Sequence, residues 1–166
     1  EAHLNLGRIL LATGQLDDSA EPLGKALGLA PKDPTANYYW AYLMQRRDRP
    51  HEAMEYYRRA VALDSKFVPA LLGVASLFVA DEQGEWSDAK EAIAFARKAC
   101  EVTKRKDIDS LRIMAGVYAV VGQFDEASRA ARDAIEVAQA AGDRQSADRI
   151  QGMLKLYEQL RAGKAD

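Results

Sequence analysis

Side chains that could do nucleophilic, acid–base or metal chemistry are few in this chain. Cys100 is the only cysteine among 166 residues, and His3 and His51 are the only histidines. A single thiol excludes an internal disulfide and any metal site built from several thiolates. The two histidines lie far apart in the sequence, with no serine or aspartate partner implied beside either. The composition therefore argues against an enzyme.

Each of these residues also has a structural interpretation. We expect Cys100 to be a buried thiol on the inner face of an alanine-rich helix, because reactive thiols need an electropositive, partly exposed setting. His3 falls at a position for a large packing residue, and His51 begins a helix after a turn. The acidic pairs Asp17-Asp18 and Asp125-Glu126 are expected at helix starts, where carboxylates favour the positive end of the helix dipole. We therefore expect no catalytic residue, no metal and no cofactor.

The charge and hydropathy exclude other classes of function. Lys and Arg total 23 against 25 Asp and Glu, which gives a net charge of -2. Proteins that bind nucleic acids usually carry a clearly basic face, so this balance argues against a nucleic-acid partner. The longest apolar run, Val68 to Ala80, is shorter than the roughly 20 residues that span a bilayer. The short basic stretch Lys104 to Lys106 is expected to be solvated. The sequence thus predicts no direct membrane insertion.

The chain repeats itself with a period of 34 residues. Gly7, Ala41 and Ala75 lie 34 residues apart, and so do Ala26 and Ala60. A period of this size indicates helical modules that cannot bury their apolar faces alone and must stack. A stacked array offers a long concave wall to a ligand, so the sequence predicts a binding scaffold.

Helix signals dominate, and strand signals are absent. Asp33 followed by Pro34 predicts a helix start, and Gly142 predicts a helix end. Pro22 lies about five residues into a predicted helix, so we expect that helix to be frayed or to start late. The turn over 81–87 is about five residues longer than its counterparts. The predicted helices cover 2–12, 16–29, 35–46, 51–63, 68–80, 88–102, 108–121, 124–141 and 143–161.

These units resemble the tetratricopeptide repeat (TPR). The residues that carry the resemblance are Leu6-Gly7, Leu10, Gly14, Ala26 and Pro31 in the first unit, Trp40-Ala41, Glu52-Ala53, Tyr57 and Ala60 in the second, and Met114-Ala115, Tyr118, Gly122 to Ala127 and Ala134 in the fourth. Departures are Ser19 in place of an alanine, Ser65 in place of a proline, and the long turn of the third unit. The resemblance implies an all-α, right-handed α-solenoid of about four stacked repeats plus a capping helix. The expected boundaries are 1–33, 34–67, 68–107 and 108–141 for the repeats and 142–166 for the cap and tail.

A narrower resemblance concerns the later part of the chain. The stretch Ala92 to Thr103 is similar to the final repeats of large bacterial proteins, where a lengthened turn also precedes an alanine-rich helix. Met153 to Tyr157 resembles their last helix. Because Glu1 already lies inside a repeat, we expect the chain to be part of a longer protein.

In the TPR family the first helix of each pair lines the concave wall, so the resemblance selects candidate groove residues. Some relatives clamp a C-terminal carboxylate in these slots, but the matching positions here hold Leu4, Tyr39, Pro69 and Gly73, so no clamp is expected. The expected wall is aromatic and apolar, with arginines on its flanks, Arg46 among them. Its predicted residues are Asn5, Arg8, Tyr38, Tyr39, Tyr42, Leu72, Gly73, Ser76, Arg112, Ile113 and Gly116.

Three classes of function stay open on the sequence. The first is a non-catalytic scaffold that binds a peptide or helix of a partner protein in the groove. The second is a structural role, in which the array packs against the rest of a parent protein or self-associates through exposed repeat ends. The third, an enzyme, would need chemistry supplied by another part. A concentration-independent monomer would favour the first class, and dimers would favour the second.

Overall fold

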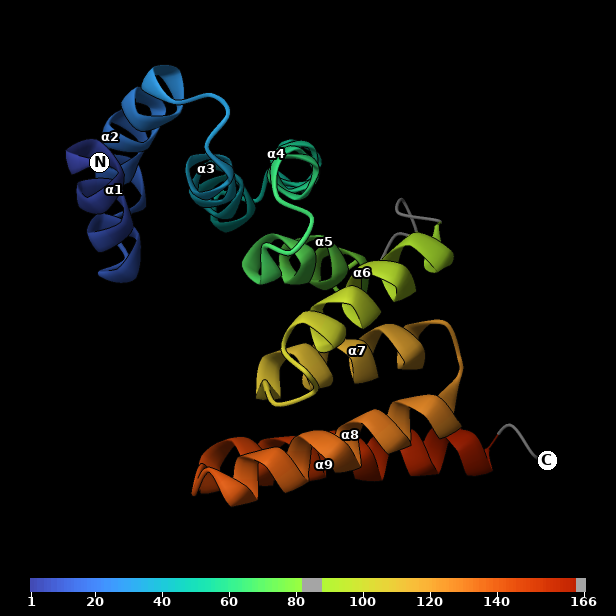
Figure 1. Cartoon of the computed structure of the whole chain (residues 1–166). Helices are drawn as coiled ribbons and strands as arrows, with labels where there is room; N and C mark the ends of the chain where they lie inside the picture. Colours follow the sequence, from blue (N-terminus) through green and yellow to red (C-terminus); the bar gives the residue numbers. More distant parts are fainter. Residues whose placement is uncertain (82–87, 164–166) are drawn as a thin grey trace. The chain divides into compact units, whose positions relative to one another are not determined.

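The computed structural model describes residues 1–81 and 88–163, and within these ranges it contains helices and no strand (Figure 1). This agrees with the predicted all-α class. The helices are α1 (Ala2–Ala12), α2 (Leu16–Leu29), α3 (Pro34–Arg46), α4 (Pro50–Leu63), α5 (Val68–Val79), α6 (Ala89–Val102), α7 (Ile108–Val120), α8 (Phe124–Ala140) and α9 (Arg144–Ala162). We refer to α1, α3, α5 and α7 as first helices, and to α2, α4, α6 and α8 as second helices.

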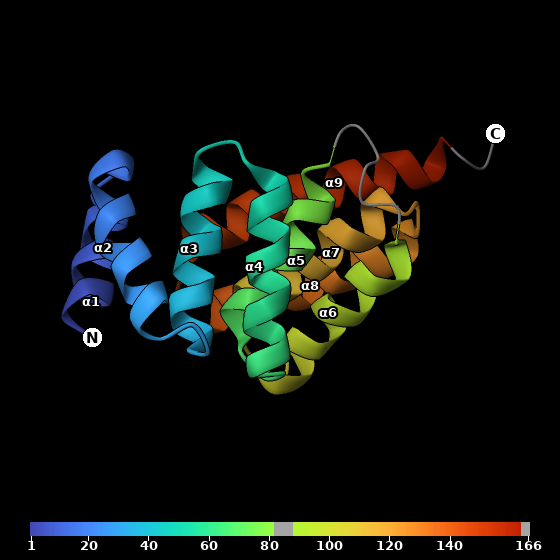
Figure 2. The same ribbon diagram turned by 90° about the horizontal axis from the view of Figure 1, so that it is seen from above.

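The chain forms two compact units, Glu1–Val74 and Ala75–Asp166. In the first unit α1 packs on α2, α2 on α3, and α3 on α4. Figure 2 shows α2, α3 and α4 side by side. The small residue at Gly7 permits the first of these contacts, because a Cβ atom there would lie 2.5 Å from the side chain of Leu23. The repeating small-residue position therefore allows a first and a second helix to pack closely.

The second unit is built around alanine-rich second helices. Ala127, Ala131, Ala134 and Ala138 of α8 are fully buried, and α8 packs against both α7 and α9. Small side chains allow α8 to approach both neighbouring helices closely. The last helix, α9, covers α8 with a single buried stripe. That stripe is made of Ala147, Ile150, Leu154 and Tyr157, and Met153 beside it is half-buried.

An aspartate caps each of the helices α3, α7 and α9, which follow a completed helix pair. The carboxylate of Asp33 accepts a hydrogen bond from the Thr35 amide at 2.8 Å. Asp107 caps α7 through the Ser110 amide at 2.7 Å, and Asp143 caps α9 through the Ser146 amide at 3.0 Å. Each cap satisfies an amide that has no partner inside its helix.

The predicted helix bounds differ from the observed ones by at most one residue. The helices predicted over 68–80, 88–102, 108–121, 124–141 and 143–161 run over Val68–Val79, Ala89–Val102, Ile108–Val120, Phe124–Ala140 and Arg144–Ala162. The helices predicted from residues 35 and 51 each begin one residue earlier, at Pro34 and Pro50, since proline at the first helical position loses no intrahelical hydrogen bond. The expectation that Pro22 would fray its helix is wrong, because α2 runs from Leu16 to Leu29 with a buried Pro22 inside it. The packing of Pro22 and its neighbour Leu23 offsets the missing backbone bond. Residues 82–87, which make up most of the predicted long turn, lie outside the described residues.

Candidate functional site

Three tyrosines from the predicted wall gather on α3 in the first unit. Tyr38, Tyr39 and Tyr42 are each half-buried. The rings of Tyr38 and Tyr39 meet edge to face with centroids 5.0 Å apart. Tyr38 and Tyr42, one helical turn apart, are stacked at 6.3 Å with an interplanar angle of 15°. The three rings therefore form one cluster, here named the tyrosine cluster.

Tyr38 is the inner member of the tyrosine cluster. Its ring lies 5.8 Å from the ring of Tyr57 on α4 and 5.7 Å from that of Phe67, edge to face at 84°. Burial, followed by the neighbouring Tyr39 and Tyr42, raises the pKa of Tyr38 to about 12. Tyr57 beneath it is buried, and its hydroxyl donates to Gln45 Oε1 at 2.7 Å. Tyr38 thus anchors the cluster, and Tyr39 and Tyr42 form its outer part.

An arginine borders the outer part of the tyrosine cluster. Arg46 lies one turn beyond Tyr42, and its Nη1 atom donates to the Tyr42 hydroxyl at 3.3 Å. Its guanidinium carbon lies 5.9 Å from the centre of the Tyr42 ring, within reach of a cation–π attraction. Because Arg46 is exposed, the rim of the cluster is both aromatic and positively charged.

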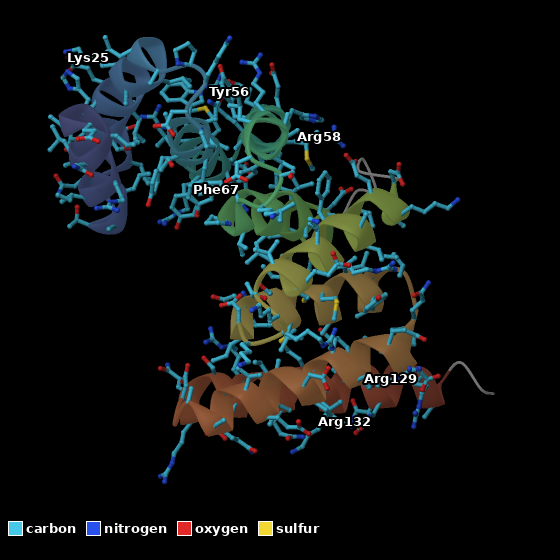
Figure 3. The ribbon with its side chains drawn as sticks, viewed as in Figure 1. Lys25, Tyr56, Arg58, Phe67, Arg129 and Arg132 are labelled. Atoms are coloured by element: carbon cyan, nitrogen blue, oxygen red, sulfur yellow. The ribbon has the colours of Figure 1, made fainter. Side chains whose placement is uncertain are left out.

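A second aromatic group, which was not predicted from the sequence, lies on the other side of α3. Trp40 and Tyr56 meet edge to face at 6.3 Å, and the Arg59 guanidinium lies 4.7 Å from the centre of the Tyr56 ring. Figure 3 shows Tyr56 and Phe67 on opposite sides of the α3–α4 pair. The signal was available, since Trp40 follows Tyr38 by two residues and a helix turns about 200° over that distance.

The other predicted wall residues of the first unit lie on α1 and α5. Asn5 and Arg8 are exposed on α1, and Leu72 is half-buried on α5. Gly73 was predicted to line the wall, but it is buried. A Cβ atom at Gly73 would lie 2.6 Å from the ring of Tyr57, so this glycine allows α5 to pack against α4.

The second unit contains the remaining predicted residues. Ser76, Arg112 and Ile113 are half-buried. Arg112 donates from Nε and Nη2 to Asp109 Oδ1, at 3.1 and 2.9 Å, so its charge is partly neutralised. The predicted wall residue Gly116 is buried instead, and a Cβ atom there would lie 3.3 Å from Val79.

The residues considered for chemistry take structural positions. Cys100 is 2% exposed, as predicted, and burial raises the pKa of its thiol to about 11. His3 is exposed rather than packed, and His51 is also exposed. Arg105 of the basic stretch pairs with Asp133 on α8. Within residues 1–81 and 88–163, no group of three or more histidine, cysteine or acidic side chains could hold a metal ion. No described helix is long and apolar enough to cross a bilayer.

The acidic pairs expected at helix starts lie in first turns, where two of their members join ion pairs between helices. Asp17 accepts from Arg47 at 2.8 Å, and Asp125 pairs with Arg161 at 2.9 Å. The Asp125–Arg161 pair lines a depression of about 320 Å³ beside the α7–α8 turn. Because the two charges neutralise each other, this depression offers no strong charge to a ligand.

The half-buried Tyr38 and the buried Cys100 thiol predict a loss of stability at alkaline pH. The pKa of Tyr38 is raised from 10.0 to about 12, and that of Cys100 from 9.0 to about 11. A raised folded-state pKa means that the native protein holds protons that the unfolded chain releases, so stability is complete below the unfolded pKa and falls above it. We expect the urea midpoint to decline between about pH 9 and 12. Tyr38→Phe should reduce the decline. A urea midpoint that stays constant between about pH 9 and 12 would contradict the raised pKa values of Tyr38 and Cys100.

Comparison with known proteins places the chain in a family. Residues 27–140 match the family model described as the Cilia and flagella-associated protein 70 middle TPR-like domain. Residues 1–33 match the tetratricopeptide repeat model. The chain belongs to the tetratricopeptide repeat family. The TPR interpretation of the sequence is therefore confirmed.

Solved TPR structures share the fold over nearly the whole chain. A thermophilic TPR protein of Thermus thermophilus is 21% identical with a TM-score of 0.70, and the match covers 99% of this chain and 96% of that one. PilW, described as a widely conserved type IV pilus biogenesis factor, is 19% identical with a TM-score of 0.67 over 93% of this chain and 76% of its own. Yeast Tom70 is 16% identical with a TM-score of 0.72, and the match covers 98% of this chain and 33% of Tom70. No curated protein sequence matches the chain significantly. The predicted TPR solenoid class is confirmed by these likenesses.

Proposed function

We propose that this TPR chain is a non-catalytic scaffold whose first unit binds a peptide or helix of a partner protein at the tyrosine cluster. The observation that carries the proposal is the arrangement of the three rings. Tyr38 is held from within by Tyr57 and Phe67, while Tyr39 and Tyr42 keep part of their surface exposed. A fixed aromatic surface binds at low entropic cost, because its side chains are ordered before the partner arrives.

The surroundings of the cluster suit a protein segment. Tyrosine and arginine are among the residues enriched at energetic hot spots of interfaces. Arg46 borders Tyr42 directly, and Arg8 and Asn5 are exposed on α1 of the same unit. Leu72 adds apolar surface on α5. Since the slots of a carboxylate clamp hold other residue types, the partner need not present its C-terminus, and binding should depend only weakly on salt.

Ser76, Arg112 and Ile113 remain candidate contacts of the second unit. Each keeps part of its surface exposed, and Ile113 supplies an apolar side chain next to the Arg112–Asp109 pair. We propose that these residues also contact a partner. Their contribution can be measured separately, with variants confined to that unit.

The test begins with peptides selected on the intact chain from a random 12-residue library. Tyr39→Ala combined with Tyr42→Ala should weaken binding of the selected peptide at least about tenfold, or 1.4 kcal/mol, in calorimetry. Tyr39→Phe combined with Tyr42→Phe should retain most of the affinity, because the ring area is kept. We expect dissociation constants on the order of micromolar, as for many transient interfaces.

A matched control is available on the opposite side of α3. Tyr56→Ala removes an aromatic ring of the second group and should leave peptide affinity unchanged. Circular dichroism must show that each variant keeps its helical signal. Normal binding by the double alanine variant, or its unfolding, would mean that the tyrosines belong to the core, and the site assignment would fail.

A structural role is the second candidate, and one observation favours it. Leu6 and Ile9 of α1 are 50% and 57% exposed, which is unusual for two neighbouring apolar residues on one helix face. Such a face suits packing against another protein segment or a second copy of the chain. Sedimentation at increasing concentration would detect self-association.

A further inference from the structure

Three large apolar side chains of the second unit stay exposed near the carboxyl ends of α7 and α9. Val120 of α7 is 52% exposed, and Leu156 and Leu160 of α9 are 51% and 44% exposed. Leu156 follows the aspartate that caps α9 by the same number of residues as Val120 follows the aspartate that caps α7. The chain runs in the same direction in α7 and α9 (Figure 1), so these side chains lie toward the same end of the second unit.

A glycine leaves room beside the exposed leucines. Gly152, Leu156 and Leu160 follow one another at a spacing of four residues and therefore share one face of α9. Gly152 is exposed, and nothing lies within 4 Å of the position that its Cβ atom would take. The backbone of another helix can therefore approach α9 closely at this point.

The exposed side chains of α7 and α9 are continuous with the core of the second unit. The two helices contact each other. Ala119 beside Val120, and Met153 beside Gly152, are half-buried and pack against that core. We refer to Val120, Gly152, Leu156 and Leu160 as the aliphatic strip.

The charged side chains beside the aliphatic strip are cationic. Arg149 lies about two helical turns before Leu156 on the same face of α9, and Lys155 precedes Leu156 directly. Both are exposed. The ion pairs of α9 within the described residues involve Glu158 and Arg161 instead. Arg149 donates only to the Ser146 hydroxyl, at 3.4 Å.

The remaining charges of α9 do not cancel these two cations. Arg144 and Asp148 are both exposed and also lie outside the ion pairs of the described residues. Their opposite charges offset each other. The charge that α9 presents beside the aliphatic strip is therefore positive, and it favours a partner that brings carboxylates.

The same charges argue against a second copy of this chain as the occupant. A two-fold pairing of two strips would place α9 against α9, and the cations of both copies would then share one interface. Leu6 and Ile9 give α1 an exposed apolar face as well. However, α1 carries Arg8 and no acidic residue, so pairing α1 of one copy with α9 of another would also oppose like charges.

We propose that the aliphatic strip binds an amphipathic helix of another protein, whose aliphatic face is bordered by glutamate or aspartate side chains. Aliphatic residues three and four positions apart on that helix contact Val120, Leu156 and Leu160. Its acidic border meets Arg149 and Lys155. The proposal goes beyond the tyrosine cluster and does not rest on it, because the two surfaces belong to different units.

The probe is a designed helical peptide of about 18 residues, or five turns, with leucines three and four positions apart and glutamates beside them. Fluorescence anisotropy with the intact chain should give a dissociation constant below about 100 μM. The same peptide with a lysine for each glutamate should bind at least about tenfold more weakly. Arg149→Glu combined with Lys155→Glu should reverse this preference. A glutamate peptide with two central prolines, which cannot form the helix, should lose its affinity.

Substitutions on the strip locate the binding. Leu156→Glu combined with Leu160→Glu should weaken binding of the glutamate peptide at least about tenfold. Leu6→Glu is the matched control, because Leu6 is 50% exposed on α1, and it should leave the affinity unchanged. Circular dichroism should show the same helical signal in all of these variants, since the replaced side chains are exposed.

Four results would overturn the proposal. The first three are no binding of the glutamate peptide at about 1 mM, equal affinity for the lysine or the proline peptide, and binding that survives Leu156→Glu with Leu160→Glu. The fourth is concentration-dependent dimerisation of the chain that these two substitutions abolish, which would assign the strip to a second copy. Tyr39→Ala with Tyr42→Ala should leave the glutamate peptide bound, so failure here can be distinguished from failure at the tyrosine cluster.

Discussion

Truncating the chain after Gly142 is expected to remove most of the stability of the second unit. The lost helix, α9, buries Ile150, Leu154 and Tyr157 against α8. Burial of a large apolar side chain is worth about 1.5–3 kcal/mol relative to exposure. Truncation would also expose the alanine face of α8, which favours aggregation. Thermal unfolding followed by circular dichroism should show a large fall in Tm or visible aggregation on heating.

A single substitution tests the same contact without shortening the chain. Ile150 is 0% exposed, so Ile150→Ala should cost about 2–5 kcal/mol in urea unfolding. Leu156 on the same helix is 51% exposed, and Leu156→Ala should change the free energy of unfolding by at most about 0.5 kcal/mol. Equal effects of the two substitutions would mean that α9 does not cover α8 by its buried stripe.

Replacing Gly73 by alanine is expected to destabilise the first unit. The added methyl group would lie 2.6 Å from the ring of Tyr57. That ring cannot easily move away, because it is buried and its hydroxyl is held by Gln45 at 2.7 Å. Overpacking of this kind costs about 1–3 kcal/mol, which exceeds the roughly 0.5–1 kcal/mol that alanine gains over glycine inside a helix. The free energy of unfolding of Gly73→Ala should therefore fall.

Gly28 provides the matched control. It also lies inside a helix, but nothing approaches within 4 Å of its added Cβ position. Gly28→Ala should raise the free energy of unfolding by about 0.5–1 kcal/mol. Tyr57→Leu combined with Gly73→Ala should recover part of the loss, since the clash with the ring is removed. If Gly73→Ala were as stable as Gly28→Ala, the close approach of α4 and α5 would be wrong.

The sequence predicted the helices well, because repeat spacing and the helix-start signals at Asp33 and Pro34 are local. It failed at Pro22, where packing of the surrounding helix outweighs a local rule. It also failed at Gly73 and Gly116, since neighbouring slots of a first helix differ by only about 100° in direction. Counting positions along a first helix cannot distinguish a residue that faces the concave wall from one that contacts the next helix.

The candidate site could be predicted only in part. The tyrosine cluster follows from three tyrosines spaced along one helix, but the anchoring of Tyr38 by Phe67 depends on the path of a later turn. Ion pairs such as Arg47–Asp17 join residues 30 positions apart, and the periodicity of the sequence carries no information about them.

The aspartate caps have a consequence for exchanging parts between proteins of this kind. Asp33, Asp107 and Asp143 each belong functionally to the helix that follows them, since each holds an amide two or three residues ahead. A recombination junction placed just after one of them would separate a helix from its own start signal. Junctions placed before these aspartates would transfer each module with its cap intact. A segment exchanged between proteins should therefore begin at the capping aspartate, one residue before the helix.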